Sequence, residues 1–248
     1  MRGLRTGDSG LSDQGSAQSS VPSPRSSSRA AIIVAAGRGT RMGEDKVWLP
    51  LGGLPVVAHS LRAFATCPSV ERLILVVAPA RMDRGRELVA RLGIHATVCE
   101  GGERRQDSVR NGLDALPEEG LVAVHDGARP MVTPALIEAC YRAAERDGAA
   151  VPAVAVRDTL KRASSDLWVV ETVDRSNLWA VQTPQVFRTE LIREAYARLD
   201  REVTDDAAAV ELLGRPVRIV PGDPRNFKLT TPEDLEVASA LVEGCRSD

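Results

Sequence analysis

Short apolar runs alternate with longer amphipathic segments from residue 30 onward. The apolar runs are continuous, which is typical of parallel strands buried on both faces. We expect strands at Ala30–Ala36, Leu73–Ala78, Ala96–Cys99, Leu121–His125 and Ala149–Val156. We expect helices between them at Val56–Thr66, Met82–Leu92, Gln106–Leu116 and Pro134–Arg146. This rhythm predicts an α/β fold with a doubly wound, mostly parallel, Rossmann-like sheet.

The rhythm breaks between about residues 157 and 181. Two β-like pieces, Thr159–Arg162 and Trp168–Val173, flank a polar turn at residues 164–166, which is a hairpin pattern. An isolated two-stranded hairpin is marginal in water, so it would be steadier against a second copy of the chain. Spacing alone leaves a dimer arm and a lid or surface decoration equally open.

After the hairpin, the pattern predicts two helices, a short strand and a last helix. The helices are expected at Glu190–Leu199 and Asp205–Leu213, and the strand at Val217–Val220. Thr231 followed by Pro232 is a helix N-terminal signal. We therefore expect one domain over residues 30–243.

Residues 1–29 have a different composition from the rest of the chain. They are rich in Ser, Gly, Pro and Arg and have no hydrophobic centre. This composition argues against a secretory signal and predicts a disordered tail. A targeting role is the alternative, because the segment is rich in Arg and Ser.

Composition narrows the classes of function. The net charge of −2 and an aromatic content of 3% both argue against a nucleic-acid-binding surface. No apolar run approaches the length that crosses a membrane. The four cysteines are far apart, which favours free thiols in a reducing cytoplasm over a metal site or disulfides.

The first predicted strand leads into a glycine loop that carries two cations, Arg41 and Lys46. Backbone N–H groups around Gly37 and Gly39 can approach phosphate oxygens closely, and the cations can neutralise them. The spacing fits neither a Walker A loop nor a dinucleotide fingerprint. We expect a phosphate-binding loop, and the alternative is a tight turn that binds nothing.

Two further loops follow predicted strands, and ligands of doubly wound sheets bind at such strand ends. The glycine pair of GGERRQDSVRNGL, residues 101–113, lets the chain pass close to a nucleobase and its ribose. Spacing alone slightly favours the alternative, an ordinary helix N-terminus with solvated charges.

Asp126 ends the fourth strand, where a carboxylate is well placed to hold Mg²⁺. The alternative is an ion pair with Arg129 that closes a turn. We expect His125 to pack or to orient Asp126. Lys228 precedes the last helix and gains a role only if the chain folds back to the same crevice. Cations, one carboxylate and glycine loops predict electrostatic catalysis of phosphoryl transfer.

Seven motifs occur in a fixed order: AAGRGTRMG with Lys46, GGERRQDSV, VHDGARP, VRDTLKR, TVDRSNLWAVQTPQVF, VTDDAAAVE and NFKLTTPEDL. Together they closely resemble the 2-C-methyl-D-erythritol 4-phosphate cytidylyltransferase family of the isoprenoid precursor pathway, over residues 31 to about 240. The resemblance implies a nucleotidyltransferase-type sheet with an inserted β-hairpin dimerisation arm. It also implies transfer of the cytidylyl group of CTP to the polyol phosphate, with Mg²⁺ and release of pyrophosphate.

The resemblance further implies roles for individual residues. The catalytic residues are Arg41, Lys46 and Lys228, of which the first two stabilise charge on the α-phosphate. The nucleotide-binding residues are Ala35, Ala36, Gly37, Gly39, Gly102, Glu103, Ser108, Asp126 and Gly127. The substrate-binding residues are Asp126, Thr159, Arg175, Thr204 and Lys228, and Asp126 is also linked to the metal. Thr159 and Arg175 lie on the arm and, by the resemblance, serve the partner's site in a homodimer.

Three positions depart from the commonest family pattern. Asp45-Lys46-Val47 replaces Pro-Lys-Gln, but the lysine is kept and the chemistry is expected to be unchanged. Glu103 stands where Asp is frequent, so its longer side chain is expected to shift the cytosine contact or to route it through water. Gly127 replaces a frequent Ala without expected consequence.

Three other functions compete with this interpretation. A related cytidylyltransferase that uses ribitol 5-phosphate would share the nucleotide half of the site. A catalytically silent nucleotide-binding regulator is disfavoured by the retained cations. A dehydrogenase is disfavoured by the glycine spacing and by the absence of an acid at the end of the second strand.

Overall fold

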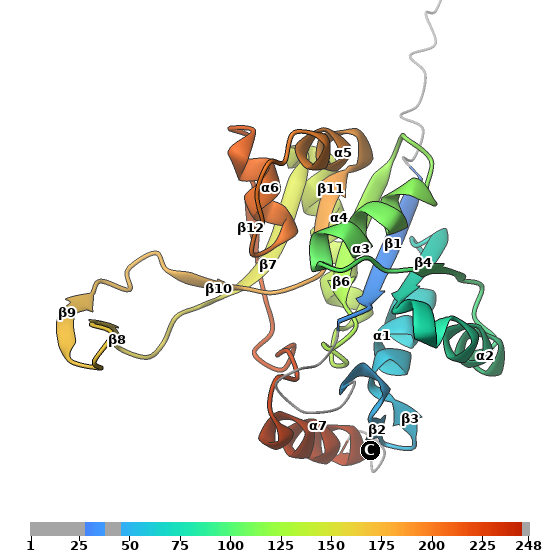
Figure 1. Ribbon diagram of the computed structural model, residues 1–248, viewed down its shortest axis with the longest axis horizontal. Coiled ribbons are helices and arrows are strands. Elements are labelled where there is room, and N and C mark those ends of the chain that lie inside the picture. The colour runs from blue at the N-terminus through green and yellow to red at the C-terminus, as the bar shows by residue number, and fades with distance from the viewer. Residues whose placement is uncertain (1–27, 38–45, 245–248) are drawn as a thin grey trace, which may run out of the picture.

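The computed structural model describes residues 28–37 and 46–244, and it confirms the predicted alternation of strands and helices (Figure 1). The five predicted strands are β1 (Arg29–Ala35), β4 (Arg72–Val77), β5 (Thr97–Glu100), β6 (Leu121–Asp126) and β7 (Ala149–Ala155). The helices between them are α1 (Val56–Ala65), α2 (Met82–Leu92), α3 (Arg105–Asp114) and α4 (Pro134–Asp147). The expected tail lies outside the described residues except for its last two positions.

The central sheet has eight strands, and most neighbours are parallel, as predicted. β6, β1, β4 and β5 pair in parallel in that order, and β12 (Arg218–Pro221) pairs in parallel with β7. Two short segments, β10 (Trp179–Val181) and β11 (Gln185–Arg188), run antiparallel to β7 one after the other. β11 also pairs antiparallel with β6 and so joins the two halves of the sheet.

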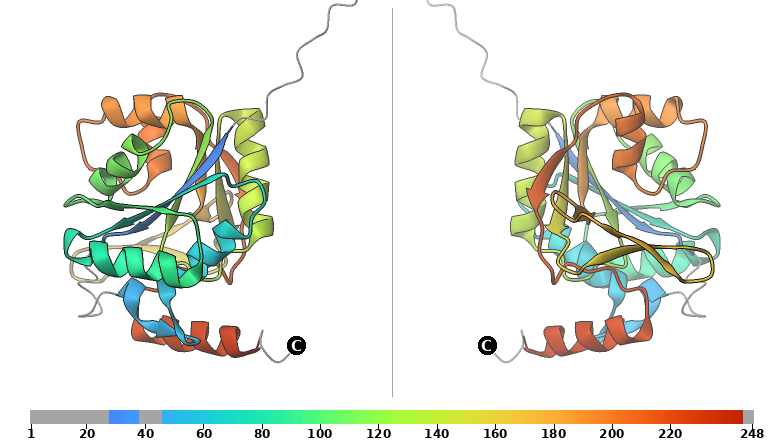
Figure 2. Two further views of the ribbon diagram at one scale, coloured as in Figure 1. Left: turned by 90° about the vertical axis from the view of Figure 1, so that its right-hand side faces the viewer. Right: turned by 90° about the vertical axis from the view of Figure 1, so that its left-hand side faces the viewer.

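Helices cover both faces of this sheet (Figure 2). Side chains from α1, α2 and α4 pack on one face, and side chains from α3, α5 (Thr189–Ala197) and α6 (Asp206–Leu212) pack on the other. Successive strand residues point to opposite faces, so Ile32 and Ile33 of β1 belong to different clusters although both are fully buried. This two-sided burial explains why the strands are continuously apolar.

A small third cluster lies beyond the carboxyl ends of the strands. The two-residue strands β2 (Pro50–Leu51) and β3 (Leu54–Pro55) follow the 3₁₀ turn η1 (Lys46–Trp48), and β2 packs against α7 (Pro232–Gly244). Gly52, with φ of +54°, allows this contact, since a Cβ there would lie 2.6 Å from Val242. Leu229 N–H donates to the Ala128 carbonyl at 2.8 Å, which brings the segment before α7 back to the sheet.

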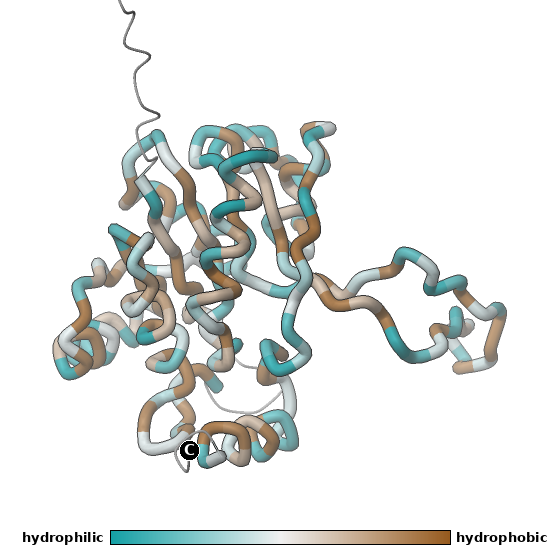
Figure 3. The backbone as a smooth tube through the Cα atoms, turned by 180° about the vertical axis from the view of Figure 1, so that it is seen from behind, coloured by the Kyte–Doolittle hydropathy of each residue, from teal (hydrophilic) through white to brown (hydrophobic). Residues whose placement is uncertain are grey.

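The predicted hairpin is present as β8 (Leu160–Ala163) and β9 (Val169–Val173), which project away from the sheet (Figure 1). Its tip is hydrophobic (Figure 3), and Leu167, Trp168, Val169 and Val170 are each at least 63% exposed. The hairpin thus places apolar side chains in solvent when one chain is considered alone.

Two further expectations concern the state of the cysteines and membrane-spanning segments. Cys67, Cys99 and Cys140 are free thiols, whereas Cys245 is outside the described residues. Burial raises the pKa of Cys99 to about 11 and that of Cys140 to about 12, so neither is a reactive thiolate at neutral pH. Within residues 28–37 and 46–244, no helix combines the length and apolar character needed to span a bilayer.

Candidate active site

A pocket opens where β1 and β6 end, between the start of α3 and the segment that precedes α7. Its wall brings together many of the predicted site residues: Ala35, Ala36, Gly37, Lys46, Gly102, Glu103, Ser108, Asp126 and Lys228. They come from stretches far apart in sequence, and the return of residues 228–230 to the sheet completes the wall. The chain therefore folds back so that Lys228 lies in the crevice, which was the condition for Lys228 to have a role.

The floor of this pocket depends on the glycine pair after β5. A Cβ on Gly101 would lie 2.2 Å from the Ala36 Cβ, and one on Gly102 would lie 2.3 Å from the Asp107 Cβ, so no side chain fits at either position. The Ser108 hydroxyl accepts a hydrogen bond from Gly102 N–H at 3.1 Å. The Asp107 carboxylate also accepts from Arg104 N–H at 3.3 Å, which caps the N-terminus of α3. The loop therefore both lines the pocket and begins a helix, so the two interpretations of this motif hold together.

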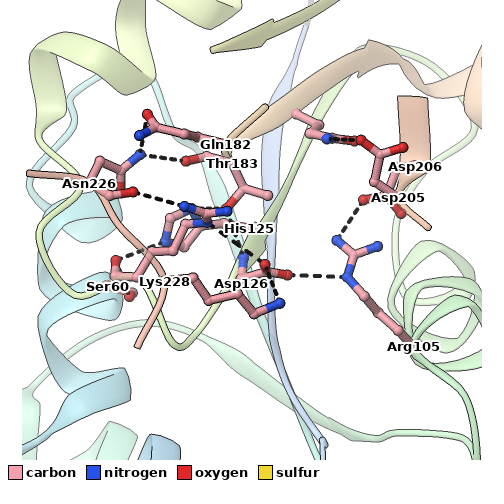
Figure 4. Close-up of polar contacts among 12 residues, drawn as sticks. Ser60, Arg105, His125, Asp126, Gln182, Thr183, Asp205, Asp206, Asn226 and Lys228 are labelled. Carbon is pink, nitrogen blue, oxygen red and sulfur yellow. Dashed lines mark hydrogen bonds and ion pairs between the residues drawn. The ribbon is translucent and has the colours of Figure 1, made fainter. Parts of the chain in front are cut away.

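Asp126 lies at the centre of the charged groups in the crevice (Figure 4). Its carboxylate is 2.8 Å from Lys228 Nζ and 3.1 Å from Arg105 Nε, and Arg129 Nε lies 3.8 Å away. The ion pair with Arg129 that was the structural alternative is thus present, but it is the longest of the three. Burial alone would raise the pKa of Asp126, but Arg105, Lys228 and Arg129 hold it well below its usual range. The carboxylate is therefore ionised at neutral pH.

Arg105 belongs to a buried network that sequence reasoning missed. Its Nη2 donates to Asp206 at 2.7 Å, and the Tyr196 hydroxyl donates to the other Asp206 oxygen at 2.5 Å. Asp206 is fully buried at the start of α6. Burial lowers the pKa of Arg105, but Asp206 and Asp126 raise it above its ordinary value, so this arginine stays charged. In the sequence, these residues look like ordinary charges at helix starts.

A second pocket adjoins the first and shares three residues with it. Arg105, Asp126 and Lys228 line both, and Arg129 and Thr204 line the second alone. The shared wall carries two cations and one carboxylate, and Arg129 adds a third cation. Adjoining pockets of this kind suit two phosphate-bearing ligands that meet at the shared wall.

Other predicted site residues lie elsewhere. Thr159 and Arg175 are exposed on the arm and contribute to neither pocket as the described residues form them. Gly127 N–H donates to the Val34 carbonyl at 2.9 Å, which places this residue behind the described wall of the first pocket. Gly39 and Arg41 lie outside the described residues, so their roles stay predictions.

The donor set of the crevice can be tested against a metal ion. Among the described residues there is no group of three or more His, Cys, Asp or Glu side chains that could hold one. Mg²⁺ commonly takes only one or two carboxylates and completes its shell with substrate phosphates and water. Asp126 in a phosphate-sized pocket fits that mode, and it does not fit a transition-metal site built from protein ligands.

Comparison with known proteins identifies the family. The family model for 2-C-methyl-D-erythritol 4-phosphate cytidylyltransferase matches residues 29–244. A relative with that name from Pelotomaculum thermopropionicum is 51% identical over 223 residues, which is 86% of this chain and 94% of the relative. The one from Geobacillus kaustophilus is 49% identical over 219 residues, 86% of this chain and 96% of the relative.

Solved structures agree in fold. The 2-C-methyl-D-erythritol 4-phosphate cytidylyltransferase of Thermus thermophilus aligns with a TM-score of 0.74 at 36% identity, over 87% of this chain and 99% of that chain. The 4-diphosphocytidyl-2C-methyl-D-erythritol synthase of Anaerococcus prevotii aligns with a TM-score of 0.78 at 30% identity, over 88% of this chain and 100% of that chain. The chain therefore belongs to the 2-C-methyl-D-erythritol 4-phosphate cytidylyltransferase family of nucleotidyltransferases.

Proposed function

We propose that the crevice at the ends of β1 and β6 is where this cytidylyltransferase joins CTP to 2-C-methyl-D-erythritol 4-phosphate. The products are 4-diphosphocytidyl-2-C-methyl-D-erythritol and pyrophosphate. Family membership supports the reaction, and the ribitol 5-phosphate alternative has no such support. The observation that carries the assignment to this crevice is the pair of adjoining pockets that share Arg105, Asp126 and Lys228.

In this proposal the first pocket takes CTP. The cytosine and ribose lie on the floor formed by Gly102, Glu103 and Ser108, where no side chain fits at the glycine pair. The triphosphate extends toward Gly37 and Lys46, which line the same pocket. Arg41, four residues beyond Gly37, is proposed to act beside Lys46 on the α-phosphate.

The second pocket takes the polyol phosphate, with Thr204 and Lys228 in its wall. A phosphate monoester has its second pKa at about 6, so its oxygen is anionic at neutral pH and needs no general base. This oxygen forms a bond to the α-phosphorus of CTP, and the bond from that phosphorus to the β-phosphate bridging oxygen breaks. The electron pair leaves with pyrophosphate. Lys46, Arg41 and Lys228 offset the charge that accumulates on the transferred phosphoryl oxygens.

Asp126 is proposed to hold Mg²⁺ together with the triphosphate oxygens. The bound ion would supply positive charge that offsets the phosphate oxygens during transfer. Asp126 also fixes Lys228, whose Nζ lies 2.8 Å from its carboxylate, at the boundary between the two pockets. Lys228 is therefore placed to contact whichever phosphate reaches that boundary.

The arm is proposed to complete the site of a second copy of the chain. Thr159 and Arg175 lie on it, and neither lines the two pockets of its own chain as the described residues form them. The exposed apolar tip supports burial against a partner, because water contact with such side chains is unfavourable. The three described free thiols fit a reducing compartment, which we propose to be the cytoplasm.

A pyrophosphate-release assay tests this function. The chain is incubated with CTP and Mg²⁺, and with either 2-C-methyl-D-erythritol 4-phosphate or ribitol 5-phosphate. We expect pyrophosphate with the first acceptor, at least roughly a hundredfold more slowly with the second, and none when Mg²⁺ is withheld with EDTA. Equal kcat/KM values for the two acceptors, or no release with the first, would overturn the assignment.

A further inference from the structure

His125 is a fully buried polar side chain directly behind the charged crevice. It precedes Asp126 on β6 and points to the opposite face of the sheet, where its ring packs against Phe64 of α1 with centroids 5.1 Å apart. It contributes to neither of the two pockets as the described residues form them. The phosphoryl transfer proposed above does not use this group.

The hydrogen bonds of His125 form a directed chain (Figure 4). Asp126 N–H donates to Thr183 Oγ1 at 3.1 Å, and Thr183 Oγ1 lies 3.0 Å from His125 Nδ1. At the other side of the ring, His125 Nε2 lies 3.2 Å from the Arg129 carbonyl oxygen. The relay therefore starts at the Asp126 backbone and ends at the Arg129 backbone.

The direction of each bond follows from counting hydrogens. A carbonyl oxygen accepts only, so His125 Nε2 must carry a hydrogen. The Thr183 hydroxyl has two printed partners, Asp126 N–H and His125 Nδ1, so its hydrogen points to Nδ1, which therefore carries none. Thr183 has one hydroxyl hydrogen, which it donates to Nδ1 while it accepts from Asp126 N–H. Every polar atom of the relay is then satisfied in a single arrangement.

Further bonds connect this relay to the other charged residues of the crevice. The Thr183 carbonyl accepts from Asn226 Nδ2 at 2.9 Å, and the Asn226 carbonyl accepts from Arg129 Nη1 at 2.9 Å. Asn226 lies two residues before Lys228. Thr183 and His125 thus bond the backbones of Asp126 and Arg129 and, through Asn226, the segment that carries Lys228, while Ser60 Oγ also donates to the Arg129 carbonyl at 3.2 Å.

We propose that His125 is a positioning residue for cytidylyl transfer: its ring, hydrogen-bonded at both nitrogens, fixes Thr183 and the Arg129 carbonyl, and through them Asp126, Arg129 and Lys228. The inference rests on the function proposed above for the crevice. Displacement of reacting groups by about 1 Å can cost roughly a hundredfold in rate, so a buried support matters for turnover.

Two variants of His125 separate this role from simple packing. His125→Phe keeps an aromatic ring beside Phe64 but removes both hydrogen bonds. His125→Asn places an amide oxygen near the position of Nδ1 and can accept the Thr183 hydrogen. We expect His125→Phe to lower kcat roughly tenfold or more, with the KM for CTP changed less than about threefold, and His125→Asn to recover most of kcat. An unchanged kcat in His125→Phe would overturn the proposal.

Thr183 supplies a second pair of variants with a matched control. Thr183→Val leaves Asp126 N–H without its acceptor, whereas Thr183→Ser keeps the hydroxyl. Thr189, the first residue of α5, is also buried and lies just beyond the other end of β11, so Thr189→Val reports what the same substitution does at a buried site that bonds neither Asp126 nor His125. We expect kcat to fall only in Thr183→Val. An equal fall in Thr189→Val would show a general packing effect and overturn the positioning role.

Nitrogen NMR of the unmodified protein gives a readout that is independent of activity. The chain has three histidines, so ¹⁵N-histidine labelling gives three ring systems, and His125→Phe identifies the one that disappears. We expect the His125 ring to carry its hydrogen on Nε2, which faces the Arg129 carbonyl, and not on Nδ1, which faces the Thr183 hydroxyl. A hydrogen on Nδ1 would overturn the relay even in an active enzyme. The expected tautomer in a chain that does not use CTP would instead overturn the proposed function.

Discussion

Two arginine–carboxylate pairs show how differently the crevice and the arm are built. In the crevice, Arg105 meets Asp206 at 2.7 Å, and the Asp206 side chain is fully buried. In the arm, Arg162 meets Glu171 at 2.6 Å, but the two side chains are 64% and 54% exposed. Water and salt screen the second pair much more than the first, so nearly equal distances correspond to different energies.

The apolar residues of the two regions differ in the same way. Strand side chains under the crevice are buried on both faces, whereas Trp168 and Val170 at the tip of the arm are 76% and 64% exposed. The crevice is therefore stabilised by contacts within one chain. The arm has an uncovered surface that a second copy of the chain is proposed to bury. The same sequence thus builds one region whose apolar side chains are covered within the chain and one whose apolar side chains are exposed.

The largest expected effect comes from breaking the buried Arg105–Asp206 ion pair of the crevice. Asp206→Asn keeps the shape but removes the charge that holds Arg105, and removing one partner of a buried pair costs about 3–5 kcal/mol. We expect the free energy of unfolding, measured by urea denaturation, to fall by about that amount. Asp83→Asn is the matched control, because Asp83 pairs with Arg86 on the surface and its side chain is 91% exposed. A similar fall in the free energy of unfolding of both variants would contradict the difference between the buried and the exposed ion pair.

The architecture under the crevice could be predicted because it follows from local pattern. Continuous apolar runs gave five strands and periodic segments gave the helices between them, with ends that differ by one or two residues from the structure. The strand formed by β10 and β11 was not predicted, because its two pieces are short and stand beside an inserted hairpin. Pairing across that insertion is a long-range property that no local window contains.

Prediction of the site from the sequence has the same limit, because it detects local patterns and not long-range contacts. The glycine loops and Asp126 could be predicted from their position at strand ends, where ligands bind in this fold. The contact of Lys228 with Asp126 depends on the return of a segment about a hundred residues away, and only the family resemblance anticipated it. Arg105, Asp206 and Tyr196 could not be distinguished from surface residues, because burial decides their role and the sequence shows only the type of each side chain.

The next largest effect concerns the phosphate end of the crevice. Lys46→Ala removes one of the cations proposed to stabilise the transferred phosphoryl group, and we expect turnover to fall at least roughly a hundredfold, about 2.7 kcal/mol. The measurement is pyrophosphate release at saturating CTP. Arg86→Ala is the control for loss of a surface cation, because that side chain is 61% exposed on α2. Near-normal turnover of Lys46→Ala would exclude the proposed role.

A smaller effect tests whether the arm is an interface. Trp168→Asp places a charge in the exposed apolar tip, and we expect the dimer dissociation constant, measured by sedimentation equilibrium, to rise at least roughly tenfold. The free energy of unfolding of the sheet should stay unchanged, because β8 and β9 form a sheet of their own. Leu212→Ser, at an apolar site that is 56% exposed on α6, is the control. A chain that is monomeric and fully active before substitution would exclude the arm as an interface.

The smallest expected effect concerns the exposed Arg162–Glu171 ion pair of the arm, and it tests the difference between buried and exposed pairs most directly. A double-mutant cycle of Arg162→Ala and Glu171→Ala, made in the Trp168→Asp background, should give a coupling free energy of at most about 0.5 kcal/mol, because both groups stay hydrated. In the unmodified chain, the coupling should be larger only if a partner chain covers the pair and removes water from it. A coupling above about 1 kcal/mol in the monomeric background would show that a single arm already shields its charges. In that case exposure could not explain the difference between the two regions, and the crevice would owe its stability to geometry instead of burial.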